Sequence, residues 1–152
     1  MLCLEGAQAG LSWITVLRKR DSYRLAFDGF DPEKMAVYGA ATRARLLQNS
    51  GIVRNRLKIA AFIDNAKSYL DVRGRNGSFD RYLWQFTDGR VLRRRPQNLA
   101  AIRSSSPESD AMSKQLKKDG FRFVGTTICY AFMQAVGIVD EHQRQCWAGK
   151  RN

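Results

Sequence analysis

Helical hydrophobic periodicity, interrupted by glycines, is the feature of this sequence that most restricts its fold. In the longest periodic stretch, residues 57–70, apolar residues recur at intervals of three and four, as one face of a helix requires. Strand signals are nearly absent, because Asn76-Gly77 and Asp88-Gly89 lie in polar surroundings rather than between alternating apolar runs. These patterns predict an all-α protein, a bundle of roughly seven or eight short helices.

Capping residues mark several of the expected boundaries. Asp21 is placed to cap a short helix, and Asp31-Pro32 opens the next turn with Asp as the cap and Pro at the first helical position. A later helix is expected over residues 109–119, and a last apolar helix over residues 126–136, where a glycine follows.

Residues 87–107 carry the weakest pattern and predict a long internal connection, punctuated by Arg93–Pro96 and Ser104–Pro107. We expect the Arg93–Arg95 run to be a flexible basic loop. With 152 residues, of which 44% are hydrophobic, the chain can bury a real core, and we expect residues 1–152 to form a single domain.

The charge balance is strongly basic. Lys and Arg number 26 against 14 Asp and Glu, which gives a formal net charge of +12. Such a surface favours polyanionic partners, with nucleic acid first and an anionic membrane surface second. The alternative is a basic surface that only keeps the protein soluble.

The expected cellular compartment is inferred from three features that the sequence lacks. It has no apolar run long enough for a transmembrane helix and no basic segment followed by an apolar stretch at its start, so we expect neither a membrane span nor a signal peptide. Its three cysteines are an odd count at wide spacing, unlike a disulfide framework. A reducing compartment fits better, and we expect a cytoplasmic protein.

The segment Gly120–Gly125, called the hairpin below, joins the last two predicted helices. Its flanking glycines let the backbone approach a phosphate closely, and the helix that opens at Thr126 offers unpaired N–H groups and a positive dipole end to the anion. Phe121, Phe123 and Val124 can turn inward to fix its angle. Such a segment binds the DNA backbone without reading sequence, although an ordinary turn between two helices remains the alternative.

Several segments resemble DNA-3-methyladenine glycosylase I, a family of helix-hairpin-helix DNA glycosylases. The resemblance covers essentially the whole chain, and its motifs occur in the family's order. They are Glu5–Leu17, Phe30–Pro32, Gly51–Ile59, Gly120–Thr126, Ile128–Tyr130, Phe132–Ala135 and His142.

The resemblance implies base-excision repair of alkylated, double-stranded DNA by a monomer that associates with the bacterial nucleoid when bound to DNA. The implied reaction hydrolyses the N-glycosidic bond of 3-methyladenine and leaves an abasic site, after the base has left the stack. Alkylation makes the purine a cation and a good leaving group, so recognition, positioning and charge stabilisation are the main tasks of the enzyme.

Four residues near the start of the chain match the family's site. Glu5 corresponds to the catalytic carboxylate that hydrogen-bonds the excised purine, and Trp13 to the aromatic side chain that stacks on it. Leu11 corresponds to an apolar plug at the vacated stack, with Gly10 allowing close approach. Without the resemblance, Glu5 would be a surface glutamate, and Trp13 and Leu11 would be core residues. The resemblance also assigns DNA contacts to the hairpin and to Thr126.

His142 and Cys146 are four residues apart, so on a helix they would share a face and could bind one metal ion. In the family this pair supplies half of a structural zinc site, and the other half lies near the family's N-terminus. Only four residues precede Glu5 here, so we expect the family's N-terminal segment to be lacking. In the family that segment contains two zinc ligands, a pocket tyrosine and tryptophans that enclose the base, and we expect this chain to lack them.

Two smaller questions stay open. Asp140 lies where other helix-hairpin-helix glycosylases have an aspartate that stabilises the sugar cation, but the resembled family generally lacks that aspartate, and we prefer the interpretation that Asp140 caps a helix that carries His142. Arg54, Arg56 and Lys58 form either a phosphate-binding group or a solvated basic face.

Three hypotheses follow: an alkylpurine DNA glycosylase, a DNA-binding remnant of that family that has lost its chemistry, and a basic helical protein that binds another protein. Glu5, Trp13 and the hairpin favour the first over the third.

Overall fold

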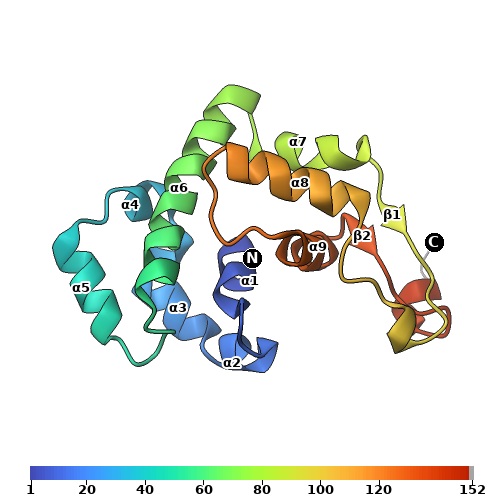
Figure 1. Ribbon diagram of the computed structural model, residues 1–152, viewed down its shortest axis with the longest axis horizontal. Helices are drawn as coiled ribbons and strands as arrows, with labels where there is room; N and C mark the ends of the chain where they lie inside the picture. Colours follow the sequence, from blue (N-terminus) through green and yellow to red (C-terminus); the bar gives the residue numbers. More distant parts are fainter. Residues whose placement is uncertain (151–152) are drawn as a thin grey trace.

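The computed structural model describes the backbone of residues 1–150 and the side chains of residues 1–148. Nine α-helices lie in this part of the chain (Figure 1), and the all-α prediction is confirmed. They are α1 (Leu2–Gln8), α2 (Trp13–Arg18), α3 (Arg20–Ala26), α4 (Pro32–Ala36), α5 (Ala40–Gln48), α6 (Arg56–Asn76), α7 (Phe79–Trp84), α8 (Pro107–Lys118) and α9 (Thr126–Ala135).

Capping chemistry explains most boundaries. Asp31 caps α4 by accepting hydrogen bonds from the backbone N–H groups of Glu33 and Lys34, as predicted. The long helix α6 begins after Asn55, whose side chain accepts from the N–H groups at its second and third positions. Asp21 does not cap α3, because that helix begins at Arg20 and contains Asp21 in its first turn.

The start of α8 lies two residues before the expected Ser109. Ser106 is the N-cap, and it exchanges hydrogen bonds with Ser109, whose hydroxyl accepts from the Ser106 N–H. This reciprocal pair satisfies two backbone donors that the helix leaves free.

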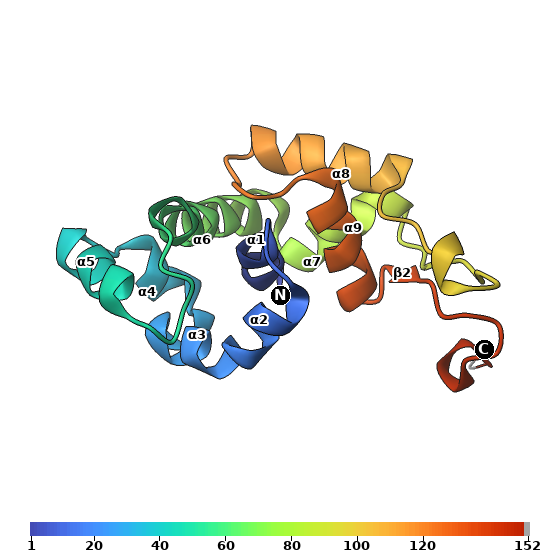
Figure 2. The same cartoon turned by 60° about the horizontal axis from the view of Figure 1, so that its bottom comes forward.

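The helix α6 lies between α5 and α8 (Figures 1 and 2) and contributes to both hydrophobic clusters. Its first half packs with residues of α1 to α5 around a stack of aromatic rings, in which Phe27 lies 4.5 Å from Phe62 of α6 and Tyr23 lies 5.5 Å from it, centroid to centroid. Further along the helix, Val72 packs with α7, α8 and α9. Both clusters therefore include residues of α6, which fixes the helices of the first cluster relative to those of the second.

The connection after α7 contains some regular structure. Beyond a 3₁₀ turn at Gln85–Thr87, β1 (Leu92–Arg93) pairs in parallel with β2 (Val139–Asp140), and a second 3₁₀ turn spans Leu99–Ala101. Further 3₁₀ turns lie at Asp28–Phe30 and Trp147–Lys150.

The expectation of a flexible loop at Arg93–Arg95 is wrong. Arg94 and Arg95 are partly buried, and the Arg95 guanidinium lies 2.8 Å from a carboxylate oxygen of Asp140. The physical reason is the parallel pairing of β1 with β2, which places this basic run beside an acidic partner more than forty residues away along the chain.

No helix in the described part of the chain is both long and apolar enough to cross a membrane.

Candidate functional site

The helix α1, the turn after it and the start of α2 carry Glu5, Gly10, Leu11 and Trp13. Gly10 has a φ of 76°, a left-handed conformation that glycine adopts without strain. The turn is closed by two hydrogen bonds of 2.6 Å each: the Leu11 N–H donates to the Gln8 carbonyl, and the Gln8 side-chain amide donates to the Leu11 carbonyl. The sequence-predicted residues thus lie in one compact unit.

Glu5 is a buried carboxylate. Only 6% of the residue is exposed, and no group in residues 1–150 donates a hydrogen bond to its carboxylate oxygens. Burial raises its pKa above the ordinary value for glutamate. A largely desolvated carboxylate without a donor from the protein favours a ligand that brings an N–H group or a positive charge. Interpretation as an ordinary surface glutamate is therefore wrong.

Trp13 and Leu11 are not core residues. They are 38% and 36% exposed, and Ile14 and Leu17 on the same short helix are exposed as well. An exposed indole face is available to stack on a base, and an exposed leucine beside a flexible glycine is available for insertion between bases. The burial pattern thus leaves both side chains free for the roles that the resemblance implies.

The hairpin has a constrained backbone. Gly120 has a φ of 90°, and Phe123 has a φ of 55°, which is uncommon for a residue with a large side chain. Phe121 and Val124 are buried as expected, and Phe123 is half-buried. Gly125 is the N-cap of α9, and within the described residues no side chain caps that helix, so its first N–H groups face outward without an intrahelical acceptor.

The hairpin and α1 touch each other. A Cβ atom built on Gly6 would lie 3.2 Å from both the Cβ and the carbonyl oxygen of Phe123. Glycine fits this approach without displacing Phe123, because 3.2 Å is tighter than ordinary van der Waals contact. The structure therefore brings the Glu5 helix and the hairpin together, although more than a hundred residues separate them.

Arg122 points its guanidinium at Asp64 of α6, at 3.0 Å. Beside the hairpin, Thr126 donates a hydrogen bond to Asp110, so an acidic residue lies near the start of α9. The Arg122 side chain is therefore paired within the protein, as are the backbone N–H groups of Gly120, Phe121 and Arg122.

Two residues of α6 connect α1 and the hairpin, and neither is identified as a site residue from the sequence. Lys58 was assigned to a phosphate-binding group or a solvated face, and both are wrong: the residue is 7% exposed, and its ammonium donates to the carbonyls of Ala7 and Ala9. Asn65 is 5% exposed and hydrogen-bonds the backbone of Arg122. Arg54 and Arg56 are exposed.

His142 and Cys146 lie close together, but on a turn rather than a helix. The thiol sulfur is 3.7 Å from Nδ1 of the imidazole, near the value of about 3.6 Å for two ligands of a tetrahedral zinc ion. Within residues 1–148 no third His, Cys, Asp or Glu joins them. Burial raises the pKa of the Cys3 thiol to about 11 and of the Cys129 thiol to about 12, which disfavours the thiolate that zinc requires. The described residues fit half of a zinc site.

Asp140 does not cap a helix, because none begins at His142. One of its carboxylate oxygens accepts from the His142 N–H at 3.3 Å, and the other pairs with Arg95. Arg95 is also the main reason that the pKa of Asp140 is lowered. The carboxylate therefore has structural partners on both oxygens.

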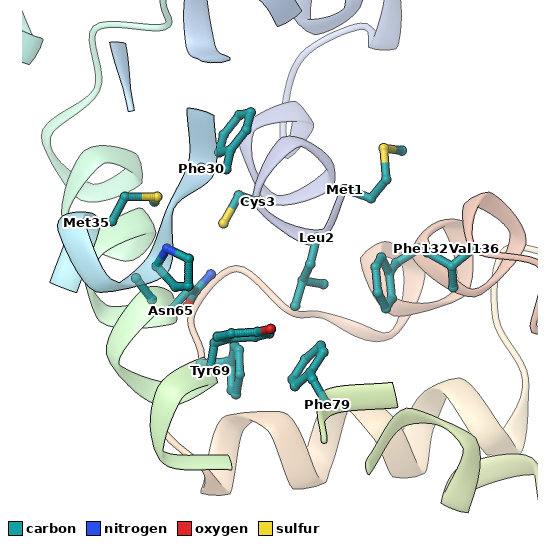
Figure 3. A pocket seen from close by; sticks show the side chains of 13 residues that line it. Met1, Leu2, Cys3, Phe30, Met35, Asn65, Tyr69, Phe79, Phe132 and Val136 are labelled. Atoms are coloured by element: carbon teal, nitrogen blue, oxygen red, sulfur yellow. The ribbon is translucent and has the colours of Figure 1, made fainter. Parts of the chain in front are cut away.

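An apolar groove of about 420 Å³ lies beside this site (Figure 3). Its walls come from the first residues of α1 and from α6, α7 and α9, and include Leu2, Tyr69, Phe79 and Phe132. Glu5 and Trp13 do not line it. The groove is thus separate from the residues that match the family's base pocket.

Comparison with known proteins places the chain in a family. The model of the methyladenine glycosylase family matches residues 1–149, and the chain belongs to that family. It is 49% identical over 146 residues to DNA-3-methyladenine glycosylase 1 of Escherichia coli (strain K12), covering 96% of this chain and 78% of that protein. It is 46% identical over 145 residues to the DNA-3-methyladenine glycosylase of Haemophilus influenzae, covering 95% and 78%.

Solved structures agree. A crystal structure of 3-methyladenine DNA glycosylase I matches with a TM-score of 0.93 and 51% identity, over 96% of this chain and 80% of that one. A structure of 3-methyladenine DNA glycosylase I from Staphylococcus aureus, described as the basis of 3-methyladenine recognition, matches with a TM-score of 0.95 and 33% identity, over 99% and 80%.

Proposed function

We infer that this protein is a DNA-3-methyladenine glycosylase that hydrolyses the N-glycosidic bond of 3-methyladenine in alkylated DNA. Family membership supports the activity. One structural observation supports the site: the buried Glu5 side chain receives no hydrogen bond from the described chain, and a single short turn joins its helix to the helix that begins with the exposed Trp13. A cationic purine satisfies both groups, since it brings positive charge to the carboxylate and a flat ring to the indole.

The chemistry needs little from the protein beyond this placement. The bond between the base and C1′ of the sugar breaks, and its electron pair neutralises the cationic purine. The oxygen of a water molecule then bonds to C1′ and loses a proton, which leaves the abasic sugar. Glu5 stabilises the positive charge of the base in its everted position, and Trp13 holds the ring plane.

DNA binding uses the other parts of the site. In the proposed arrangement α8, the hairpin and α9 form a helix-hairpin-helix unit whose backbone N–H groups bind a phosphate of double-stranded DNA. Leu11, beside Gly10, fills the space that the base leaves. The protein acts as a monomer on nucleoid DNA in the cytoplasm.

The decisive experiment measures release of 3-methyladenine from alkylated duplex DNA. Wild-type protein and Glu33→Gln, an exposed glutamate, should release the base at equal rates. Glu5→Gln should be slower by about 10- to 100-fold, because a hydrogen bond to a charged group is lost. DNA binding without base release by the wild type would favour the alternative of a DNA-binding remnant.

We also propose that a structural zinc ion binds at His142 and Cys146, which supply two of four ligands. Zinc should raise the thermal unfolding midpoint of the wild type, and EDTA should reverse the shift. Cys146→Ala and His142→Ala should abolish the response, whereas Gln143→Ala in the same turn should keep it. Equal responses in all four proteins would contradict this site.

A further inference from the structure

Three polar residues of α6 are buried, namely Lys58, Asn65 and Ser68, and the first two lie on the same side of the helix. These two are seven residues apart, which is two helical turns, so they lie above one another. Buried polar groups on a core helix are costly unless their hydrogen bonds are made. The hydrogen-bond partners of Lys58 and Asn65 therefore indicate the role of this face of α6.

Asn65 binds the middle of the hairpin through both ends of its amide. Its oxygen accepts from the Arg122 N–H at 2.7 Å, and its nitrogen donates to the Arg122 carbonyl at 3.1 Å. The arrangement imitates the pairing of two backbones, and it satisfies both polar groups of a single hairpin residue. The next residue is Phe123, with its positive φ. Asn65 thus restrains the hairpin where its backbone is least favourable.

Lys58 binds the end of α1. Its ammonium donates to the carbonyl of Ala7 at 2.7 Å and to that of Ala9 at 2.8 Å. The last carbonyls of a helix have no intrahelical donor, and a cation there makes charge-assisted hydrogen bonds and complements the helix dipole. The turn with Gly10 and Leu11 follows directly. Lys58 thus fixes the helix that carries Glu5 and the turn that leads to Trp13.

The two restrained parts meet directly. Gly6 and Cys3 of α1 face Phe123 and α6 across a seam that leaves no room for a water molecule. Figure 3 shows Asn65 on α6 close to Cys3, beside the chain that leads to α9. Because α1 and the hairpin are closely packed here, we expect a shift of one to displace the other.

We propose that Lys58 and Asn65 are positioning residues that hold the base-recognition helix and the DNA-binding hairpin at one fixed separation. The proposal rests on the proposed function, since that function gives the two parts their roles. A base that leaves the duplex reaches Glu5 only if the hairpin binds its phosphate at the right distance from the Glu5 carboxylate. Lys58 fixes the end of α1, whereas Asn65 fixes the hairpin and also contacts Cys3 near the start of α1.

The first test separates the two residues by what each variant loses. Asn65→Leu should weaken binding to a duplex that contains a tetrahydrofuran abasic-site analogue by about tenfold, since two hydrogen bonds to the hairpin are lost. Its affinity for free 3-methyladenine, measured by calorimetry, should stay within about twofold of wild type. Lys58→Met should weaken the affinity for free 3-methyladenine more than the affinity for the duplex, because it frees the end of α1 and leaves the hairpin in place.

Milder variants and matched controls accompany these. Asn65→Gln keeps an amide with both a donor and an acceptor, so its loss of duplex binding should be smaller than that of Asn65→Leu. Lys58→Arg keeps a cation and should restore base affinity. Asn76→Ala, which removes an amide bound to Val72 on the same helix, and Lys67→Met, an exposed lysine, should leave both affinities unchanged.

Amide hydrogen exchange gives a readout that does not depend on activity. Asn65 variants should lose protection in residues 121–125, and Lys58 variants in residues 9–13. Equal loss of both affinities in every variant, or unchanged protection in these segments, would overturn the positioning roles. If wild-type protein releases no 3-methyladenine but the exchange pattern holds, the proposed function fails and the mechanical link between the two parts stands.

Discussion

A buried carboxylate that lacks a hydrogen-bond donor makes the free protein less stable than it could be. Glu5 is largely desolvated and receives no hydrogen bond from the described chain, and its raised pKa means that folding disfavours the ionised form relative to the unfolded chain. Above the raised pKa the ionised side chain opposes folding, whereas below the ordinary glutamate value both folded and unfolded chains are protonated and the effect disappears. Function explains why such a group is kept, since a site that binds a cation needs an available negative charge.

Glu5→Gln should therefore stabilise the protein while it abolishes efficient excision. We expect a higher urea midpoint for the variant at pH 8, and no difference from the wild type at pH 4. Urea titrations of both proteins at the two pH values test this, with Glu33→Gln as the exposed control. A wild type that is the more stable protein at pH 8 would contradict the raised pKa.

The same pKa sets a pH dependence for base binding. Because Glu5 must be ionised to attract a cationic purine, excision by the wild type should fall as the pH drops through the raised pKa. The rate of Glu5→Gln should lack this dependence. Excision rates from pH 5 to 8, with substrate in excess, measure it.

Among the secondary-structure elements, α1 is the one whose sequence is most restricted by its neighbours. It is only seven residues long, yet Leu4, Glu5, Gly6 and Ala7 are all buried. Gly6 allows Phe123 of the hairpin to reach the helix backbone. The isolated helix would be marginal at this length, so its packing on α6, α9 and the hairpin holds it in place.

Gly6→Ala should destabilise the protein, by about 1–3 kcal/mol, because the added methyl group lies too close to Phe123. Gly74→Ala in α6 is the matched control: open space surrounds its Cβ position, and alanine should stabilise the helix by about 0.5–1 kcal/mol. Thermal unfolding of the two variants measures the difference. Equal effects of the same sign would show that α1 and the hairpin are not in tight contact.

For the whole molecule, the net charge of +12 predicts how DNA is held. Affinity for undamaged duplex should fall by about a thousandfold between 50 and 200 mM salt if about six phosphates are neutralised. Affinity for free 3-methyladenine should change little over the same range, since that ligand releases no counterions. A flat salt response for duplex DNA would contradict phosphate binding by the basic surface.

The sequence indicates the helices well and the site only in part. Periodicity and the Asp31-Pro32 cap are local signals, and the corresponding helices are present. The burial of Lys58 could not be predicted, because its partners are carbonyls some fifty residues away, and a lysine in a basic run resembles a solvated one. His142 and Cys146 were expected on a helix, but a turn brings them together as effectively.

The contact between Gly6 and Phe123 has a consequence for how the protein is made. The ribosome releases α1 more than a hundred residues before the hairpin, so one side of this contact waits for the other during synthesis. Until α9 emerges, the apolar side of α1 lacks its cover and the loop between the two halves is long. A nascent chain that has not yet released the hairpin therefore lacks the contact between Gly6 and Phe123, and this part of the fold forms only after α9 has emerged.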